Sequence, residues 1–124
     1  MKVLIADDDN GIRSLFKVFL RREFPDVSID EAVDGVEAVN AFRNGHHDVL
    51  LMDINMPEKD GYHACLDIQK ICEKNKLKLP FILFCTGFEI SEEIEKLLAD
   101  KTHYAVLKKP VSYDKLTNTI RALK

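Results

Sequence analysis

Apolar residues in this chain alternate between short continuous runs and longer stretches with helical spacing. The continuous runs are too short for helices and predict four strands, at residues 2–6, 49–52, 81–85 and 104–107. A weaker, alternating run formed by Val27, Ile29 and Ala32 predicts one more strand, nearer the edge of a sheet. Continuous apolar runs are typical of strands that are covered on both faces.

Each predicted strand is followed by apolar residues spaced three and four apart, which indicates an amphipathic helix. The side chains expected to face the core are Ile12, Leu15, Phe16, Phe19 and Leu20 in the first helix, Val36, Val39 and Phe42 in the second, Cys65, Ile68 and Cys72 with Leu66 beside them in the third, Ile94, Leu97 and Leu98 in the fourth, and Tyr113, Leu116, Ile120 and Leu123 in the fifth. Suitable caps precede several of these helices: Asp9 or Asn10, Asp34, Ser91 and Ser112. Strand and helix thus alternate five times without a break in composition, which predicts one doubly wound α/β domain with a mostly parallel sheet.

Composition narrows the function classes. With 124 residues, 31% charged residues and a net charge of −3, the chain has the size of one domain and lacks the basic footprint of a nucleic-acid-binding protein. No apolar run is long enough to span a membrane, and the first strand meets acidic residues too early for a signal peptide. The three cysteines, Cys65, Cys72 and Cys85, have no metal-binding spacing and are expected to be reduced and buried in a cytoplasmic protein.

Polar side chains at the strand ends suggest the chemistry. The carboxyl ends of parallel strands share one edge of a sheet, and this chain places Asp7 and Asp8, Asp53, Thr86 and Lys109 there. Three neighbouring carboxylates repel one another by about 1–4 kcal/mol per pair, which one lysine cannot offset. Either some acids are protonated or a hard divalent cation binds, and an oxygen-only ligand set suits magnesium. Magnesium with an ammonium and a hydroxyl favours phosphoryl transfer, with the Asp53 carboxylate as nucleophile.

The chain resembles the receiver domain of two-component response regulators over essentially its whole length, residues 1–124. The resemblance rests on four segments: the acidic end of the first strand at residues 3–9, Asp53-Ile54-Asn55-Met56-Pro57 with Asp60-Gly61, Thr86-Gly87, and Lys109-Pro110. It implies a flavodoxin-like sheet of five parallel strands in the order 2-1-3-4-5.

The resemblance also implies residue roles. Asp53 would accept the phosphoryl group, and Thr86 would hydrogen-bond it. Lys109 would pair with it, since the Lys-Pro pattern favours Lys109 over its neighbour Lys108, and the Lys109-Pro110 bond is cis in the family. Magnesium would bind Asp8 directly, Asp7 directly or through water, Asp53, and the backbone carbonyl of Asn55.

Partners and outputs follow from the same resemblance. A sensor histidine kinase or phosphotransfer protein would donate the phosphoryl group, and a downstream target protein would read the modified domain. The chain would then be a signalling switch and not an enzyme that turns over a metabolite. As written it stops at Lys124 without an output domain, which fits a single-domain receiver; a segment of a longer regulator or hybrid kinase is the alternative. A phosphorylation-dependent homodimer is compatible with the family.

Two positions depart from the family pattern or add to it. The family commonly has an aromatic residue where this chain has Val106, and the nearest aromatic, Tyr104, lies two residues earlier, which puts the aromatic half of the switch in doubt. Phe88 either shields the phosphorylated residue from water or packs against the following helix.

Two other functions fit the sequence less well than the receiver. An aspartate-nucleophile phosphatase would need an acid where Asn55 stands. An interaction module that is never phosphorylated would not need the complete set of acids, threonine and lysine.

Overall fold

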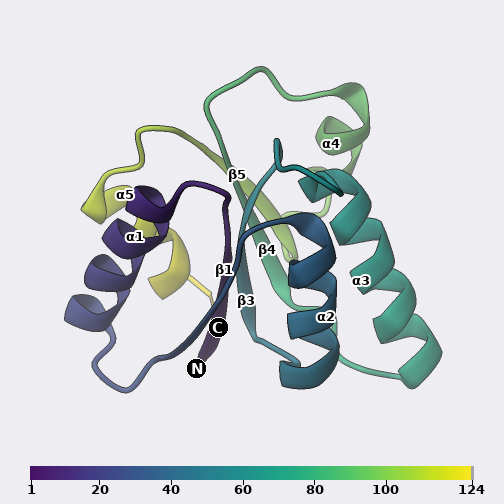
Figure 1. The fold of residues 1–124 in the computed structure, drawn as a ribbon, viewed down its shortest axis with the longest axis horizontal. Coiled ribbons are helices and arrows are strands. Elements are labelled where there is room, and N and C mark those ends of the chain that lie inside the picture. The colour runs from purple at the N-terminus through teal and green to yellow at the C-terminus, as the bar shows by residue number, and fades with distance from the viewer. Residues whose placement is uncertain (124) are drawn as a thin grey trace.

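Five strands and five helices alternate along the chain in a computed structural model that describes residues 1–123 (Figure 1). Lys124, the end of the predicted 1–124 domain, lies outside the described residues. The elements are β1 (Lys2–Ala6), α1 (Asn10–Glu23), β2 (Ser28–Ala32), α2 (Gly35–Gly45), β3 (Val49–Asp53), α3 (Gly61–Asn75), β4 (Phe81–Thr86), α4 (Glu92–Leu97), β5 (Tyr104–Lys108) and α5 (Tyr113–Arg121).

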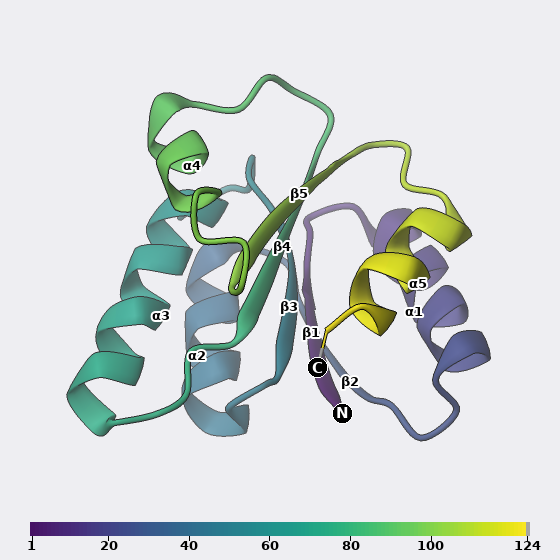
Figure 2. The same ribbon diagram turned by 180° about the vertical axis from the view of Figure 1, so that it is seen from behind.

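The strands form one parallel sheet in the order β2-β1-β3-β4-β5, which confirms the predicted doubly wound fold. Helices α1 and α5 cover one face, and α2, α3 and α4 cover the other, as Figures 1 and 2 show from opposite sides. Each face has its own apolar core. The three central strands are almost wholly buried, whereas the edge strand β2 is largely exposed, as its alternating pattern predicted.

Side-chain caps set where the helices begin. Asp9 accepts hydrogen bonds from the backbone N–H groups of Gly11 and Ile12 at the start of α1, which decides between the two predicted caps. Asp34, Ser91 and Ser112 cap their helices as predicted. The short links before these helices therefore carry the polar groups at which the helices begin.

Two predicted inward positions are wrong. Leu15 is 46% exposed, because the buried side of α1 is formed by Arg13, Phe16 and Leu20. Val36 is 44% exposed, because α2 turns Gly35 and the residues three, four and seven positions after it towards the core. In both helices the apolar pattern predicted the element but misplaced its buried side by a fraction of a turn.

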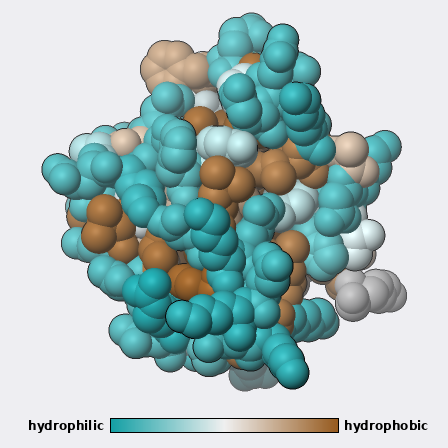
Figure 3. Space-filling view, turned by 90° about the vertical axis from the view of Figure 1, so that its right-hand side faces the viewer, coloured by the Kyte–Doolittle hydropathy of each residue, from teal (hydrophilic) through white to brown (hydrophobic). Residues whose placement is uncertain are grey.

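The surface on the α3 side is largely hydrophilic, with apolar residues in small groups between polar ones (Figure 3). None of the helices in residues 1–123 has both the length and the apolar character that crossing a membrane requires.

The three cysteines are free and buried, as predicted. Burial raises the pKa of the Cys65 and Cys85 thiols to about 12, so neither is a ready nucleophile at neutral pH.

Candidate functional site

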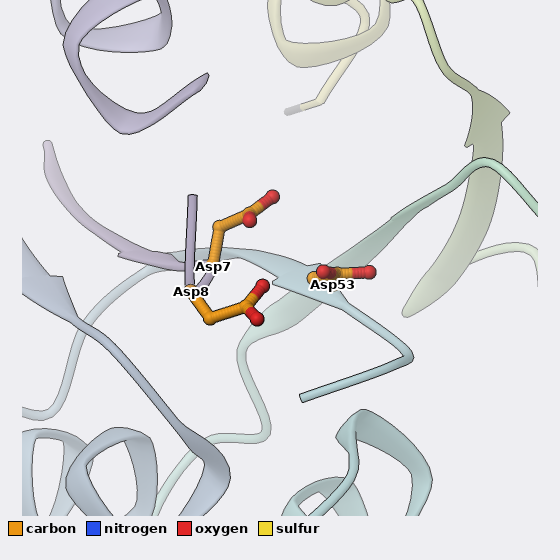
Figure 4. Close-up of side chains that lie close together, drawn as sticks. All are labelled: Asp7, Asp8 and Asp53. Atoms are coloured by element: carbon orange, nitrogen blue, oxygen red, sulfur yellow. The ribbon is translucent and has the colours of Figure 1, made fainter. Parts of the chain in front are cut away.

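Three carboxylates meet at the carboxyl edge of the sheet (Figure 4). Asp7 and Asp8 follow β1 directly, and Asp53 is the last residue of the neighbouring strand β3. One carboxylate oxygen from each residue lies within 4.8 Å of the other two. Asp7 and Asp53 are buried, whereas Asp8 is exposed. The sheet therefore brings together the three acids that the sequence placed at one edge.

Lys109 brings a positive charge to this cluster from the residue after β5. Its Nζ lies 2.8 Å from Asp7 Oδ2 and 3.4 Å from Asp53 Oδ2. The Lys109-Pro110 peptide bond is cis, as the resemblance implied. Lys108, the other lysine at this strand end, is exposed and forms no ion pair in the part of the chain that the structure describes. Of the two lysines, it is thus Lys109 that reaches the acids.

The electrostatics of the cluster are unbalanced towards negative charge. Burial raises the pKa of Asp53, and the neighbouring Asp7 carboxylate raises it further, against the opposing effect of Lys109. Burial disfavours the charged form of Lys109, but its contacts with Asp7 and Asp53 outweigh this effect and raise the pKa of the ammonium. Lys109 is therefore a fixed cation, and the remaining negative charge favours a second cation.

The donor chemistry of the cluster fits magnesium. All three converging groups are hard carboxylate oxygens, and no sulfur or imidazole ligand belongs to this group of residues. The β3–α3 loop turns sharply here, because the backbone N–H of Asn55 donates to Asp53 Oδ1 at 3.2 Å. Exposed Asp8 leaves one side of the cluster open to solvent and to an incoming group.

Thr86 stands at the end of β4, beside the reactive strand end. The register pairs Asp53 with Cys85, so Thr86 is one residue further along the neighbouring strand. Its hydroxyl is buried and accepts a hydrogen bond from the backbone N–H of Phe88 at 3.1 Å. Phe88 is 67% exposed, so its ring packs little against α4. The shielding role suggested for Phe88 stays a prediction.

Glycine allows the loops around the cluster to pack closely. A Cβ atom at Gly61 would lie 2.3 Å from the carbonyl oxygen of Asp53, and one at Gly35 would lie 2.1 Å from the carbonyl oxygen of Lys59. Both distances are impossible for a side chain, so only glycine permits these approaches. Gly35, at the start of α2, thus allows the β3–α3 loop to pack closely against this helix. This contact was not predicted from the sequence.

Tyr104, the aromatic that precedes the Val106 position, is held in place. It is buried at the start of β5, and its hydroxyl accepts a hydrogen bond from the side-chain amide of Gln69 on α3 at 2.5 Å. Val106 lies on the same face of β5 and packs against the same core. The aromatic ring is therefore anchored to α3 and not placed at the strand position that faces Phe84.

Arg13, a buried charge beside the cluster, was not among the predicted site residues. Its Nη1 donates to the backbone carbonyl of Asp7 at 2.6 Å. The sequence does contain one indication of this role. Arg13 lies on the same side of α1 as Phe16 and Leu20, where an apolar residue is usual.

Comparison with known proteins identifies the family. The family model described as the response regulator receiver domain matches residues 3–121. The chain belongs to this family. Receiver domains of this family are parts of two-component response regulators, and they are generally not enzymes that turn over metabolites.

Curated relatives of this receiver domain are longer proteins. The chain is 31% identical over 122 residues to the transcriptional regulatory protein ResD of Bacillus subtilis, covering 98% of this chain and 47% of ResD. It is 34% identical over 122 residues to the probable transcriptional regulator ycf27 of Guillardia theta, covering 98% of this chain and 44% of that protein. The receiver domain thus spans about half the length of the curated relatives it matches.

Solved structures agree on the fold. The chemotaxis protein CheY4 of Vibrio cholerae matches with a TM-score of 0.79 and 26% identity, over 99% of this chain and 98% of that one. A chain of the CheX–CheY–BeF3–magnesium complex of Borrelia burgdorferi matches with a TM-score of 0.80 and 22% identity, over 98% and 87% of the two chains. The CheY-like, flavodoxin-like fold is therefore established for this receiver domain.

Proposed function

We propose that this receiver domain accepts a phosphoryl group on Asp53 from a phosphohistidine of a sensor kinase or phosphotransfer protein, in a magnesium-dependent reaction. The observation that carries the proposal is the cluster itself: three carboxylates within 4.8 Å, with the Lys109 ammonium on two of them. This arrangement is electrostatically unfavourable unless further positive charge arrives, which favours a function in binding a cation together with a phosphoryl group.

Each residue has a distinct part in the proposed transfer. An Asp53 oxygen attacks phosphorus, so that a P–O bond forms as the P–N bond breaks and the histidine nitrogen keeps the electron pair. Lys109, already beside Asp53, pairs with the negative charge on the transferred group. Thr86, at the adjacent strand end, donates a hydrogen bond from its hydroxyl to a phosphoryl oxygen. Water later hydrolyses the acyl phosphate and resets the domain.

The residues that would hold magnesium are Asp7, Asp8, Asp53 and the backbone carbonyl of Asn55. When bound, the ion supplies positive charge that offsets the carboxylates and the phosphoryl oxygens. Among these residues, Asp7 is held by Lys109, whereas the Asp8 side chain has no hydrogen bond or ion pair with another described residue. Asp8 is therefore the carboxylate most available to a cation.

Output would run through changes in protein contacts. Phosphorylation places a phosphoryl group that carries about 1.5–2 negative charges beside Thr86, which draws its hydroxyl and the β4–α4 loop towards Asp53. Because Tyr104 is tied to Gln69, we place the switch in Thr86 and this loop and not in an aromatic rotation. Target proteins, or a second phosphorylated copy, would read the altered surface. Buried free thiols fit a cytoplasmic setting for this exchange.

The deciding experiment is incubation with acetyl phosphate, with and without magnesium, followed by intact-protein mass spectrometry. Wild type and the surface control Asp26→Asn should gain the mass of one phosphoryl group only with magnesium, and Asp53→Asn should gain none. Beryllofluoride should shift the backbone NMR signals of Thr86 and Gly87 in the same two proteins. If wild type is neither modified nor shifted, the domain is an interaction module that only shares the fold.

A further inference from the structure

Arg13 is a buried charge that makes three hydrogen bonds in three directions. Its side chain on α1 is only 10% exposed. Nη1 donates to the backbone carbonyl of Asp7 at 2.6 Å, Nε donates to Glu31 Oε1 at 3.0 Å, and Nη2 donates to Asn10 Oδ1 at 3.0 Å. The guanidinium thus ties the edge strand β2 and the first turn of α1 to the peptide group that joins Asp7 to Asp8.

That peptide group decides where the Asp8 carboxylate lies. Asp7 is fixed by hydrogen bonds of both its backbone and its side chain. Its N–H donates to the carbonyl of Ala32, and its two carboxylate oxygens accept from the N–H of Asp9 and the ammonium of Lys109. The Asp8 side chain forms no such bond with another of residues 1–123. Its direction towards Asp53 therefore depends on the backbone at Asp7, whose carbonyl Arg13 holds.

We infer that Arg13 is a positioning residue for cation binding: it fixes the Asp7–Asp8 peptide plane so that the Asp8 carboxylate stays within reach of Asp7 and Asp53. The inference rests on the proposed function, because it concerns the same magnesium site. It adds a residue outside the acidic cluster, the threonine and the lysine. Removing a group that orients metal ligands by hydrogen bonds, without binding the metal itself, typically lowers metal affinity by about 10–100-fold.

The geometry requires arginine and not merely a positive charge. The three acceptors are a backbone carbonyl, a carboxylate and a side-chain amide, and each receives a different nitrogen of one planar group. A lysine has a single nitrogen and cannot hold all three at these positions. Arg13→Lys should therefore keep the charge of the site and lose the orientation, while Arg13→Gln loses both.

The chain offers a matched control one turn further along α1. Lys17 also binds Glu31, through Nζ and Oε2 at 2.8 Å, but it makes no hydrogen bond or ion pair with the loop after β1 among the described residues. Lys17→Met removes an ion pair to the same carboxylate and leaves the Asp7 carbonyl contact intact. A general loss of helix or strand stability would affect Lys17→Met and Arg13→Lys alike.

The experiment measures magnesium binding by NMR titration of the backbone amides in wild type, Arg13→Lys, Arg13→Gln and Lys17→Met, with thermal unfolding as a check of the fold. The rate of phosphorylation by acetyl phosphate is measured in parallel over a range of magnesium concentrations. We expect the dissociation constant of magnesium to rise about tenfold or more in both Arg13 variants and to stay unchanged in Lys17→Met. The half-saturating magnesium concentration should shift equally, with the rate at saturation within about twofold of wild type.

The outcomes separate the inference from the proposed function. If wild type binds magnesium and is phosphorylated, but Arg13→Lys binds magnesium as tightly as Lys17→Met, Arg13 is only a structural residue. A lower rate at saturating magnesium with an unchanged dissociation constant would also overturn the inference. If wild type itself shows no magnesium-dependent shift, the proposed function fails first. Arg13→Lys retains the charge, so it provides the test even where Arg13→Gln does not fold.

Discussion

Replacing Asp8 with asparagine should make the magnesium-free domain more stable while weakening magnesium binding. Asp8 lies within 4.8 Å of both Asp7 and Asp53, and within residues 1–123 its side chain has no hydrogen bond or ion pair that would compensate the repulsion. Asn is nearly the same size and carries no charge. The substitution therefore removes repulsion without creating a cavity, and it removes one ligand for a cation.

The magnitude follows from the geometry. Two unit charges about 4 Å apart interact by about 1 kcal/mol in water and by about 4 kcal/mol at the effective dielectric of a protein surface. Asp8 is exposed, so the lower figure applies to each of its two repulsive pairs. Lys109 forms ion pairs with Asp7 and Asp53 but not with Asp8, so its more distant attraction offsets only part of this repulsion. The expected net effect of Asp8→Asn is a gain of about 1 kcal/mol in the free energy of unfolding.

The assay is urea denaturation at pH 7.5 and low ionic strength, first with EDTA and then with saturating magnesium. Magnesium at 100 times its dissociation constant stabilises wild type by about 2.7 kcal/mol, and Asp8→Asn should lose most of that gain. The ranking of the two proteins should therefore reverse when magnesium is added. Asp26→Asn, a substitution of an exposed acid outside the cluster, should show neither effect.

Two results would contradict the reasoning. If Asp8→Asn is less stable than wild type in EDTA, Asp8 makes a favourable contact that outweighs its repulsion by the other two acids. If Asp8→Asn gains as much stability from magnesium as wild type does, Asp8 is not a ligand. Raising the salt concentration in EDTA should shrink the difference between the two proteins, because exposed charges are screened.

Two further predictions concern pH and packing. Burial and the Asp7 carboxylate raise the pKa of Asp53 in the folded state, so this carboxyl should destabilise the magnesium-free domain most at pH 7 and less as the pH falls towards about 4. The advantage of Asp53→Asn over wild type in urea denaturation should therefore be largest at pH 7 and shrink over this range. Gly35→Ala should lower the free energy of unfolding by about 1–3 kcal/mol, because its Cβ would overlap the Lys59 carbonyl, whereas Gly87→Ala, which meets nothing within 4 Å, should change it little in the same assay.

Much of the fold could be predicted because the central strands are buried on both faces. A strand such as Val49–Asp53 must be apolar throughout, so its run stands out from the amphipathic helices on either side. The buried side of a helix is harder to predict, because one exposed apolar residue shifts the apolar side that the residue spacing indicates. Leu15 and Val36 show this: both fit the spacing, and both face solvent because a neighbour fills the inward position.

The acids of the site were predictable for a topological reason. Parallel strands share one direction, so residues directly after β1 and β3 must meet at one edge, whatever the packing beneath them. Choosing between Lys108 and Lys109 needed the family pattern, because strand alternation alone does not say which lysine turns inward. In the structure Lys109 is the one that lies 2.8 Å from Asp7.

Arg13 and Gly35 escaped prediction because their roles depend on backbone atoms of other segments. The partner of Arg13 is a carbonyl oxygen six residues earlier, and the neighbour of Gly35 is the carbonyl of Lys59. No pattern of side-chain types along the chain records such contacts. Both residues contact loops next to the acids, Arg13 the loop after β1 and Gly35 the loop after β3. The unfavourable proximity of the three carboxylates is thus maintained by groups outside the cluster, and these groups are where we expect cation affinity to be tuned.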